Sequence, residues 1–124
     1  MVFNINKGAT LPILKLELID DGIQDYAKFY DLIQNADIYF TMSDVETGRR
    51  IIGKKKAYLE SKTQYTSSYY EEFYLTYQFT EKETAKAGTY IGKFIIEFLE
   101  GTGTLIVPIN DELTINVLEG SIRK

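Results

Sequence analysis

The sequence predicts an all-β protein, an immunoglobulin-like antiparallel β-sandwich of about eight strands with short helical turns in the connections. Short segments of alternating apolar and polar residues recur between turn sequences rich in Gly, Asp, Asn and Pro, as in two-sheet sandwiches. The longest of these segments begins two residues before Tyr90, where immunoglobulin-like domains place a tyrosine that bonds back to the corner backbone. Both observations favour the same architecture.

Length and composition limit the chemistry. The 124 residues are expected to form one domain, with the core strands within 2–118 and a tail at 119–124. The sequence contains no cysteine and no histidine, which removes disulfides, thiolate nucleophiles and imidazole bases. A net charge of −4 argues against nucleic acid as the main partner. The start has no leader-like pattern and no apolar run is long enough to cross a bilayer, so we expect a soluble protein made in a reducing cytoplasm, without a membrane partner.

The first half of the chain shows four strand patterns that are separated by turns. Apolar residues alternate with polar ones in the first three, and three lysines in the fourth indicate an edge strand protected from aggregation by charge. The four segments are Val2–Asn6, Leu14–Leu18, Ala36–Met42 and Arg49–Lys56. The third and fourth are joined by a hairpin signal at Ser43–Gly48.

Two connections in this half are less regular. Asp20-Asp21-Gly22 is a typical turn sequence. Apolar residues at three-to-four spacing in Asp25–Asn35 predict a loop with a short helix.

The second half contains the aromatic centre of the chain. From Phe73 onward, alternate residues through Phe79 are expected to be buried, whereas Lys62–Ser68 is polar and is expected to be a mobile loop. Thr80 and Glu83 have the spacing of a capping box, which predicts one helical turn before the corner at Gly88. The remaining predicted strands are Gly88–Phe98, Leu105–Val107 and Leu113–Val117.

Within the long strand, one face carries Tyr90, Gly92, Phe94, Ile96 and Phe98, which are all expected to lie in the core. Gly92 stands where a disulfide-bearing sandwich would have cysteine, two residues after the tyrosine. We therefore expect the two sheets to be held together by packing alone.

Acidic residues are the only abundant groups with catalytic potential. Two clusters, one of Asp20, Asp21 and Asp25 and one of Asp111 and Glu112, could ligate calcium or act as a carboxylate pair, as in a glycosidase. Both clusters also match ordinary turn sequences, and no EF-hand spacing is present. The turn interpretation is favoured, so we expect no enzyme activity, no metal and no cofactor.

A basic and aromatic segment is the preferred candidate for a contact surface. Lysines and tyrosines together could bind a nucleic acid or a sugar. A charged edge strand with a protein contact is the favoured interpretation, because the lysine run is short and the chain is acidic. Tyrosine combines a large contact area with a polar tip, as in many interfaces. The candidate partner-binding residues are Lys54, Lys55, Lys56, Tyr58, Tyr65, Tyr69, Tyr70 and Tyr74.

Several short motifs occur in a characteristic order: an opening Phe3–Pro12, a strand ending in Asp-Asp-Gly, the segment Ala36–Met42, Ala87–Tyr90, and a last strand entered through Pro108. In this order they resemble the N-terminal immunoglobulin-like domain of tailed-phage baseplate upper proteins and related virion proteins. The resemblance covers nearly the whole chain, from residue 3 to residue 117.

The resemblance implies a non-enzymatic structural component of a tailed-phage virion, in the tail, baseplate, neck or fibre attachment. Its partners would be other virion structural proteins, and it would form a homo-oligomer or a ring within the particle. The localisation implied is the virion, after synthesis in the host cytoplasm. The alternative is a carbohydrate-binding or adhesin-like module that uses exposed tyrosines, because sugars stack on aromatic faces.

Overall fold

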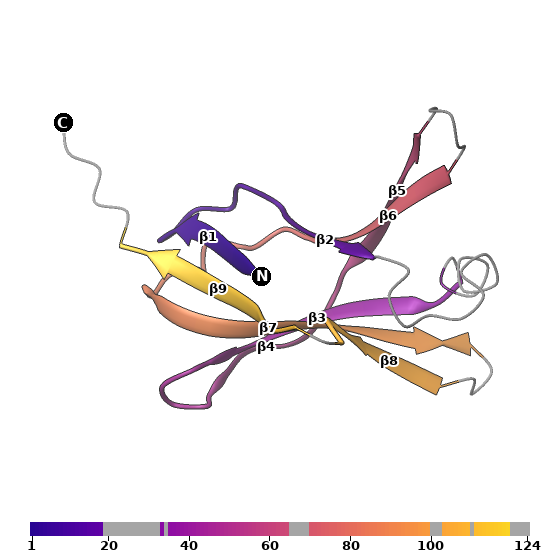
Figure 1. The fold of residues 1–124 in the computed structure, drawn as a ribbon. Coiled ribbons are helices and arrows are strands. Elements are labelled where there is room, and N and C mark those ends of the chain that lie inside the picture. The colour runs from indigo at the N-terminus through magenta and orange to yellow at the C-terminus, as the bar shows by residue number, and fades with distance from the viewer. Residues whose placement is uncertain (19–32, 34, 65–69, 100–102, 110, 120–124) are drawn as a thin grey trace.

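The computed structural model describes residues 1–18, 33, 35–64, 70–99, 103–109 and 111–119. Within these residues the chain forms nine strands in two sheets (Figure 1). The strands are β1 (Val2–Asn6), β2 (Leu14–Leu18), β3 (Asp37–Asp44), β4 (Arg50–Lys56), β5 (Tyr58–Gln64), β6 (Tyr70–Tyr77), β7 (Gly88–Phe98), β8 (Gly103–Val107) and β9 (Leu113–Leu118).

The two sheets pack as a sandwich, which confirms the predicted all-β fold. The larger sheet has the order β1-β9-β7-β3-β4, with β8 paired to the second half of β7, and the smaller sheet has the order β2-β6-β5. Immunoglobulin variable-type domains have strands G, F, C and C′ in one sheet and B, E and D in the other. The orders β9-β7-β3-β4 and β2-β6-β5 follow these two sets.

One strand pair differs from the expected antiparallel arrangement. β1 and β9 are parallel, with Val2 opposite Thr114 and Asn6 opposite Leu118. Every other pairing between the described strands is antiparallel. Alternation of side chains predicts a strand but not the direction of its neighbour, so the sequence pattern did not reveal this parallel pair.

An aromatic cluster in the core joins the two sheets. The ring of Phe40 in β3 stacks on the ring of Tyr77 in β6, with centroids 4.6 Å apart. It also lies 5.0 Å from Phe94 in β7 and makes an edge contact with Phe79 at 5.7 Å. All four side chains are buried, as alternation in β3, β6 and β7 predicted. Phe98, at the end of β7, is only partly buried.

Gly92 lies directly beneath this cluster and leaves no room for a side chain. A Cβ atom there would come within 2.7 Å of Ile115 Cδ1 and 2.8 Å of Phe40 Cζ. These two side chains fill the space where a disulfide-bearing sandwich would have its cysteine. Packing joins the sheets at this point. The expectation that packing alone holds them is wrong, because Glu83 also links Lys55 of the larger sheet to Tyr77 of the smaller one.

The tyrosine corner is confirmed. Tyr90, which is 2% exposed, donates its hydroxyl hydrogen to the backbone carbonyl of Lys86 at 2.7 Å. This bond fixes the backbone that enters β7. Burial, with a smaller contribution from the charge of Asp44, raises the pKa of the Tyr90 phenol, which favours the neutral form that donates.

The connection between β6 and β7 contains the predicted capping box. The backbone N–H of Thr80 donates to Glu83 Oε1 at 2.9 Å, and the N–H of Glu83 donates to Thr80 Oγ1 at 3.3 Å. Residues 81–84 form turns instead of the predicted helical turn.

The expected loop at Lys62–Ser68 is wrong for its first three residues. Lys62–Gln64 belong to β5 and pair with β6 in register, with Gln64 opposite Tyr70. Residues 65–69 lie outside the described residues. The turn at Asp20–Gly22 and most of the predicted loop and helix at Asp25–Asn35 also lie outside them.

Candidate functional site

One continuous segment forms an edge of both sheets. β4 is the last strand of the larger sheet and β5 is the last strand of the smaller one. Only Ala57 separates them, and its backbone N–H donates to the carbonyl of Ile38 at 2.8 Å. The prediction of an edge strand at 49–56 is therefore confirmed, and the same edge continues into β5. We call residues 50–64 the β4–β5 edge.

The three consecutive lysines of this edge do not share a face, because neighbouring strand residues point to opposite sides. Lys54 lies on the outer face of the larger sheet, where its Nζ is 2.6 Å from Glu97 Oε2 and 4.4 Å from the centroid of the Tyr39 ring. The hydrogen bond to Glu97 raises the pKa of Lys54. This lysine is held in place by one acid and one aromatic ring.

Lys55 points the other way, toward a buried carboxylate. Its register partner in β3 is the core residue Phe40, and its Nζ lies 2.7 Å from Glu83 Oε2. Glu83 is only 7% exposed and also accepts hydrogen bonds from the Tyr77 hydroxyl, at 2.8 and 3.0 Å to its two oxygens. Lys55, Tyr77 and Glu83, with the capping bond from Thr80, form a network that we call the Glu83 network.

The pKa values in the Glu83 network reflect these contacts. Burial raises the pKa of Glu83, but hydrogen bonds from Lys55, Thr80 and Tyr77 oppose this effect and bring the pKa below its usual range. Burial, together with the hydrogen bond to Glu83, raises the pKa of the Tyr77 phenol well above its usual range. Glu83 is therefore ionised and Tyr77 neutral at neutral pH, which is the state in which all the donors are satisfied.

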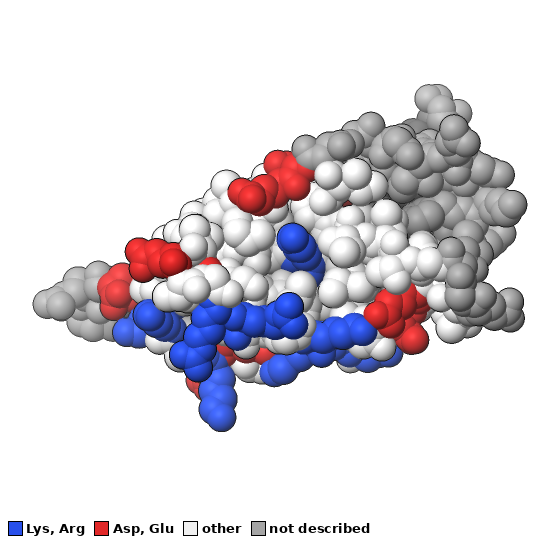
Figure 2. All heavy atoms as spheres, turned by 90° about the horizontal axis from the view of Figure 1, so that it is seen from below, with Lys and Arg blue, Asp and Glu red and all other residues white. Residues whose placement is uncertain are grey.

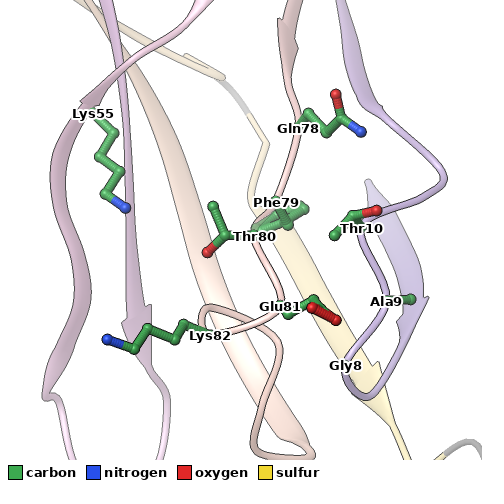
Figure 3. A pocket seen from close by; sticks show the side chains of 9 residues that line it. All are labelled: Gly8, Ala9, Thr10, Lys55, Gln78, Phe79, Thr80, Glu81 and Lys82. Carbon is green, nitrogen blue, oxygen red and sulfur yellow. The ribbon is translucent and has the colours of Figure 1, made fainter.

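An open groove lies beside Lys55, between β4 and two connections (Figure 3). The view shows Lys55 and Lys82 on one side, Thr10 and Gln78 on the other, and Phe79 between them. The groove is lined by Gly8, Ala9, Thr10, Lys55, Gln78, Phe79, Thr80, Glu81 and Lys82. Its charged groups are the ammonium groups of Lys55 and Lys82 and the carboxylate of Glu81, and Lys55 is already paired with Glu83.

Lys56 and Tyr58 lie where the chain passes from one sheet to the other. Lys56 Nζ is 5.9 Å from the centroid of the Tyr58 ring, and Tyr58 is 60% exposed. Tyr58 is opposite Thr76 in the register, and Tyr74 is two residues earlier on the same strand. The two tyrosines are therefore diagonal neighbours on the outer face of the smaller sheet.

Tyr74 is half-buried there, beside an ion pair. Lys15 Nζ lies 5.9 Å from the centroid of the Tyr74 ring and 3.0 Å from Glu60 Oε1. Glu60 is opposite Tyr74 in the register. This tyrosine is thus flanked by both signs of charge.

The structure separates the predicted contact residues into three groups. Lys54 and Lys56 lie on the outer face of the larger sheet, Lys55 points to Glu83, and the two tyrosines lie on the outer face of the smaller sheet. Tyr70 pairs with Gln64 through the β6 backbone, and Tyr65 and Tyr69 lie outside the described residues. The lysine run is therefore not one basic patch.

Of the two acidic clusters for which the sequence analysis favoured ordinary turns over metal binding or hydrolysis, only Asp111 and Glu112 lie among the described residues. Asp111 Oδ2 lies 2.8 Å from the amino group of Met1, and this hydrogen bond lowers the pKa of Asp111. Asp20, Asp21 and Asp25 lie outside the described residues. Within the described part of the chain, no three residues of the types His, Cys, Asp and Glu are grouped so that they could hold a metal ion.

Glu83 and Tyr77 are the residues of this region that the sequence analysis did not identify as a site. The capping-box spacing placed Glu83 in the connection after β6, but its burial and its lysine partner depend on how the two sheets meet.

Among the residues that the structure describes, no helix has the length and apolar character needed to cross a bilayer. Comparisons with protein-family models, with curated proteins and with solved structures each found no match for this chain.

Proposed function

We propose that the chain is a non-enzymatic structural component of a tailed-phage virion and docks on neighbouring subunits through the β4–β5 edge. The observation that carries the proposal is that one continuous segment is the last strand of both sheets and presents an exposed tyrosine, Tyr58, at the point where it changes sheet. The assignment to a virion is supported by the order of motifs in the sequence.

An edge strand has backbone groups that can pair with an added strand, and this is a common mode of peptide recognition. The Glu83 network holds β4 in position through Lys55, so the edge is ordered before a partner arrives. The groove beside Lys55 offers a place for a side chain of the partner segment. Tyr58 would supply the large apolar contact that often dominates interface energies.

Assembly with virion proteins tests the proposal. The purified chain is mixed with the tail, baseplate, neck and head proteins encoded beside it, and complexes are measured by size-exclusion chromatography with light scattering. We expect a complex with at least one of them, and a ring or another symmetric oligomer of this chain. A monomer that binds none of these proteins would contradict the proposal.

The contribution of the edge is tested with matched variants. Tyr58→Ala and Lys56→Glu should weaken the complex, because both alter exposed side chains at the centre of the edge. Lys7→Glu is the control, since Lys7 is also exposed but lies after β1 and pairs with Glu119. Equal weakening by Lys7→Glu would show that the edge is not the docking site.

A carbohydrate-binding function is the second candidate, because Tyr58 and Tyr74 share the outer face of the smaller sheet. Adjacent aromatic side chains on a sheet can stack on sugar rings. Binding to a glycan array that is lost in a Tyr58→Ala, Tyr74→Ala double variant would favour this function. If the chain bound no glycan on the array, the carbohydrate-binding function would be contradicted.

A further inference from the structure

A row of side chains crosses the outer face of the larger sheet, on the side away from the core. Tyr39 in β3 is opposite Lys56 in β4 and Ile95 in β7, and Ile95 is opposite Ile106 in β8. We call Lys56, Tyr39, Ile95 and Ile106 the outer row. Three of its four members are apolar or aromatic, although outward positions of such a sheet are usually polar.

The outer row is accessible. Ile106 is 49% exposed, and Tyr39 and Ile95 are partly exposed. Directly opposed side chains on one face are cross-strand neighbours, so the three form one apolar strip instead of isolated residues. Connected exposed apolar area of this kind marks interaction sites.

Cations line one side of the strip, and the acids Asp37 and Glu97 lie at its other side. Lys93 in β7 is exposed opposite Thr41, Arg50 in β4 is exposed opposite Ser43, and Lys54 lies over the Tyr39 ring. Figure 2 shows this face, on which the Lys and Arg side chains form a band. The whole chain has a net charge of −4, so this band does not follow from the overall composition.

We propose that the outer row docks an acidic face of another protein that has an apolar centre. The carboxylates of such a partner would meet Lys93 and Arg50, because Lys54 is already paired with Glu97. Its apolar centre would cover Ile95 and Ile106. A second copy of this chain placed on the same face would bring the two bands of cations together, which charge repulsion opposes. A nucleic acid would use the cations but would leave Ile95 and Ile106 unused. This proposal does not depend on the virion assignment. It shares Arg50, Lys54 and Lys56 with the β4–β5 edge, but it uses side chains on the outer face of the larger sheet and not the backbone of the edge strand.

A synthetic acidic polypeptide tests the chemistry directly. The probes are fluorescently labelled random copolymer of glutamate and tyrosine, polyglutamate of the same length, and a labelled DNA duplex, each titrated with the purified chain by anisotropy. We expect the copolymer to bind more tightly than polyglutamate, because only the copolymer offers aromatic groups to the apolar strip. Tighter or equal binding of the duplex would overturn the proposal in favour of a nucleic-acid surface.

Variants locate the binding. Arg50→Ala with Lys93→Ala should raise the dissociation constant for the copolymer by about tenfold, the effect expected from two surface charge contacts. Ile106→Ser should raise the dissociation constant for the copolymer and leave that for polyglutamate unchanged. Lys15→Ala is the matched control, since Lys15 is exposed on the opposite outer face of the sandwich.

The binding results of these variants either support or overturn the docking proposal. Loss of binding in the double variant and in Ile106→Ser, with the Lys15→Ala control unchanged, supports it. An equal loss in the Lys15→Ala control, or unchanged binding in Ile106→Ser, overturns it. Urea unfolding of each variant shows that it is folded, and Ile106→Ser and Lys93→Ala alter side chains that are already exposed.

Discussion

Lys55 and Glu83 connect the edge of the larger sheet to the turn that follows β6, with Nζ of the lysine 2.7 Å from Oε2 of the glutamate. The same carboxylate accepts the hydroxyl hydrogen of Tyr77, which belongs to the smaller sheet. A buried charge is tolerated only when it is paired and hydrogen-bonded, and Glu83 has both kinds of partner. In a sandwich without cysteine, this network is a polar link between the two sheets.

Removal of the Tyr77 hydroxyl should destabilise the fold. Tyr77→Phe keeps the ring that stacks on Phe40 but removes one donor to the buried carboxylate of Glu83. We expect the free energy of unfolding to fall by about 2 kcal/mol, as for a hydrogen bond to a charged group. Urea unfolding measures it. In the control Tyr58→Phe, whose ring is exposed, the change should stay within about 0.5 kcal/mol.

Stability should depend on pH through Glu83. The pKa of Glu83 in the folded state lies below its unfolded value of about 4.3. The stability that ionised Glu83 contributes is therefore fully present above about pH 4.3 and is lost as the pH falls through the folded-state pKa. In Glu83→Gln this dependence should be absent. The measurement is the difference in the free energy of unfolding between wild type and Glu83→Gln from neutral to acid pH. A difference that stays constant across the acid range would contradict the assignment of the charge to Glu83.

Tyr77 should make the free energy of unfolding depend on pH in the opposite direction, with stability lost at high pH. The pKa of its phenol is raised in the folded state, so its contribution is fully present below the unfolded value of about 10 and is lost at higher pH. Unfolding midpoints measured at increasing alkaline pH should therefore fall more steeply for wild type than for Tyr77→Phe. Parallel curves for the two proteins would show that the Tyr77 pKa is ordinary.

The tyrosine corner predicts two different effects at one position. Tyr90→Ala should lower the free energy of unfolding by about 3 kcal/mol, because a large buried ring is removed. Tyr90→Phe should lower it by about 1 kcal/mol, because only the hydrogen bond to the Lys86 carbonyl is lost. Thermal and urea unfolding check both values. A loss below about 1 kcal/mol in Tyr90→Ala would show that the ring does not support the corner.

Gly92 should not accept even a methyl group. In Gly92→Ala the added carbon would crowd Ile115 and Phe40, and we expect a loss of about 1–3 kcal/mol from overpacking. Gly53→Ala is the matched control on an edge strand, where the added carbon would meet only Arg50 Cδ at 3.9 Å. Similar unfolding midpoints for the two variants would mean that the core adjusts at Gly92 without loss.

Alternation of residue types predicted most of the strands because each buries one face. It identified the core positions of β3 and β7, and the tyrosine followed by apolar residues predicted the corner before β7. β5 was partly missed because its second half, Lys62–Gln64, is polar and carries no apolar alternation. An edge strand can be held by backbone pairing alone, which leaves little trace in the sequence.

The candidate site was less predictable than the fold. The run Lys54-Lys55-Lys56 was treated as one basic feature, although strand geometry alone sends its members to opposite sides. The partner of Lys55 could not be foreseen, because Glu83 is distant in sequence and reaches β4 only when the two sheets pack together. The outer row likewise depends on the register of four strands, which periodicity does not determine.

The parallel pairing of β1 and β9 affects how the molecule responds to mechanical load. Val2 lies beside Thr114 at one end of the pair, and Asn6 lies beside Leu118 at the other. A force that pulls on the start of β1 and on the end of β9 therefore acts along the strands in opposite directions. The hydrogen bonds between them are loaded together in shear and do not open one after another, which makes this pair a mechanical clamp along the axis of the two strands.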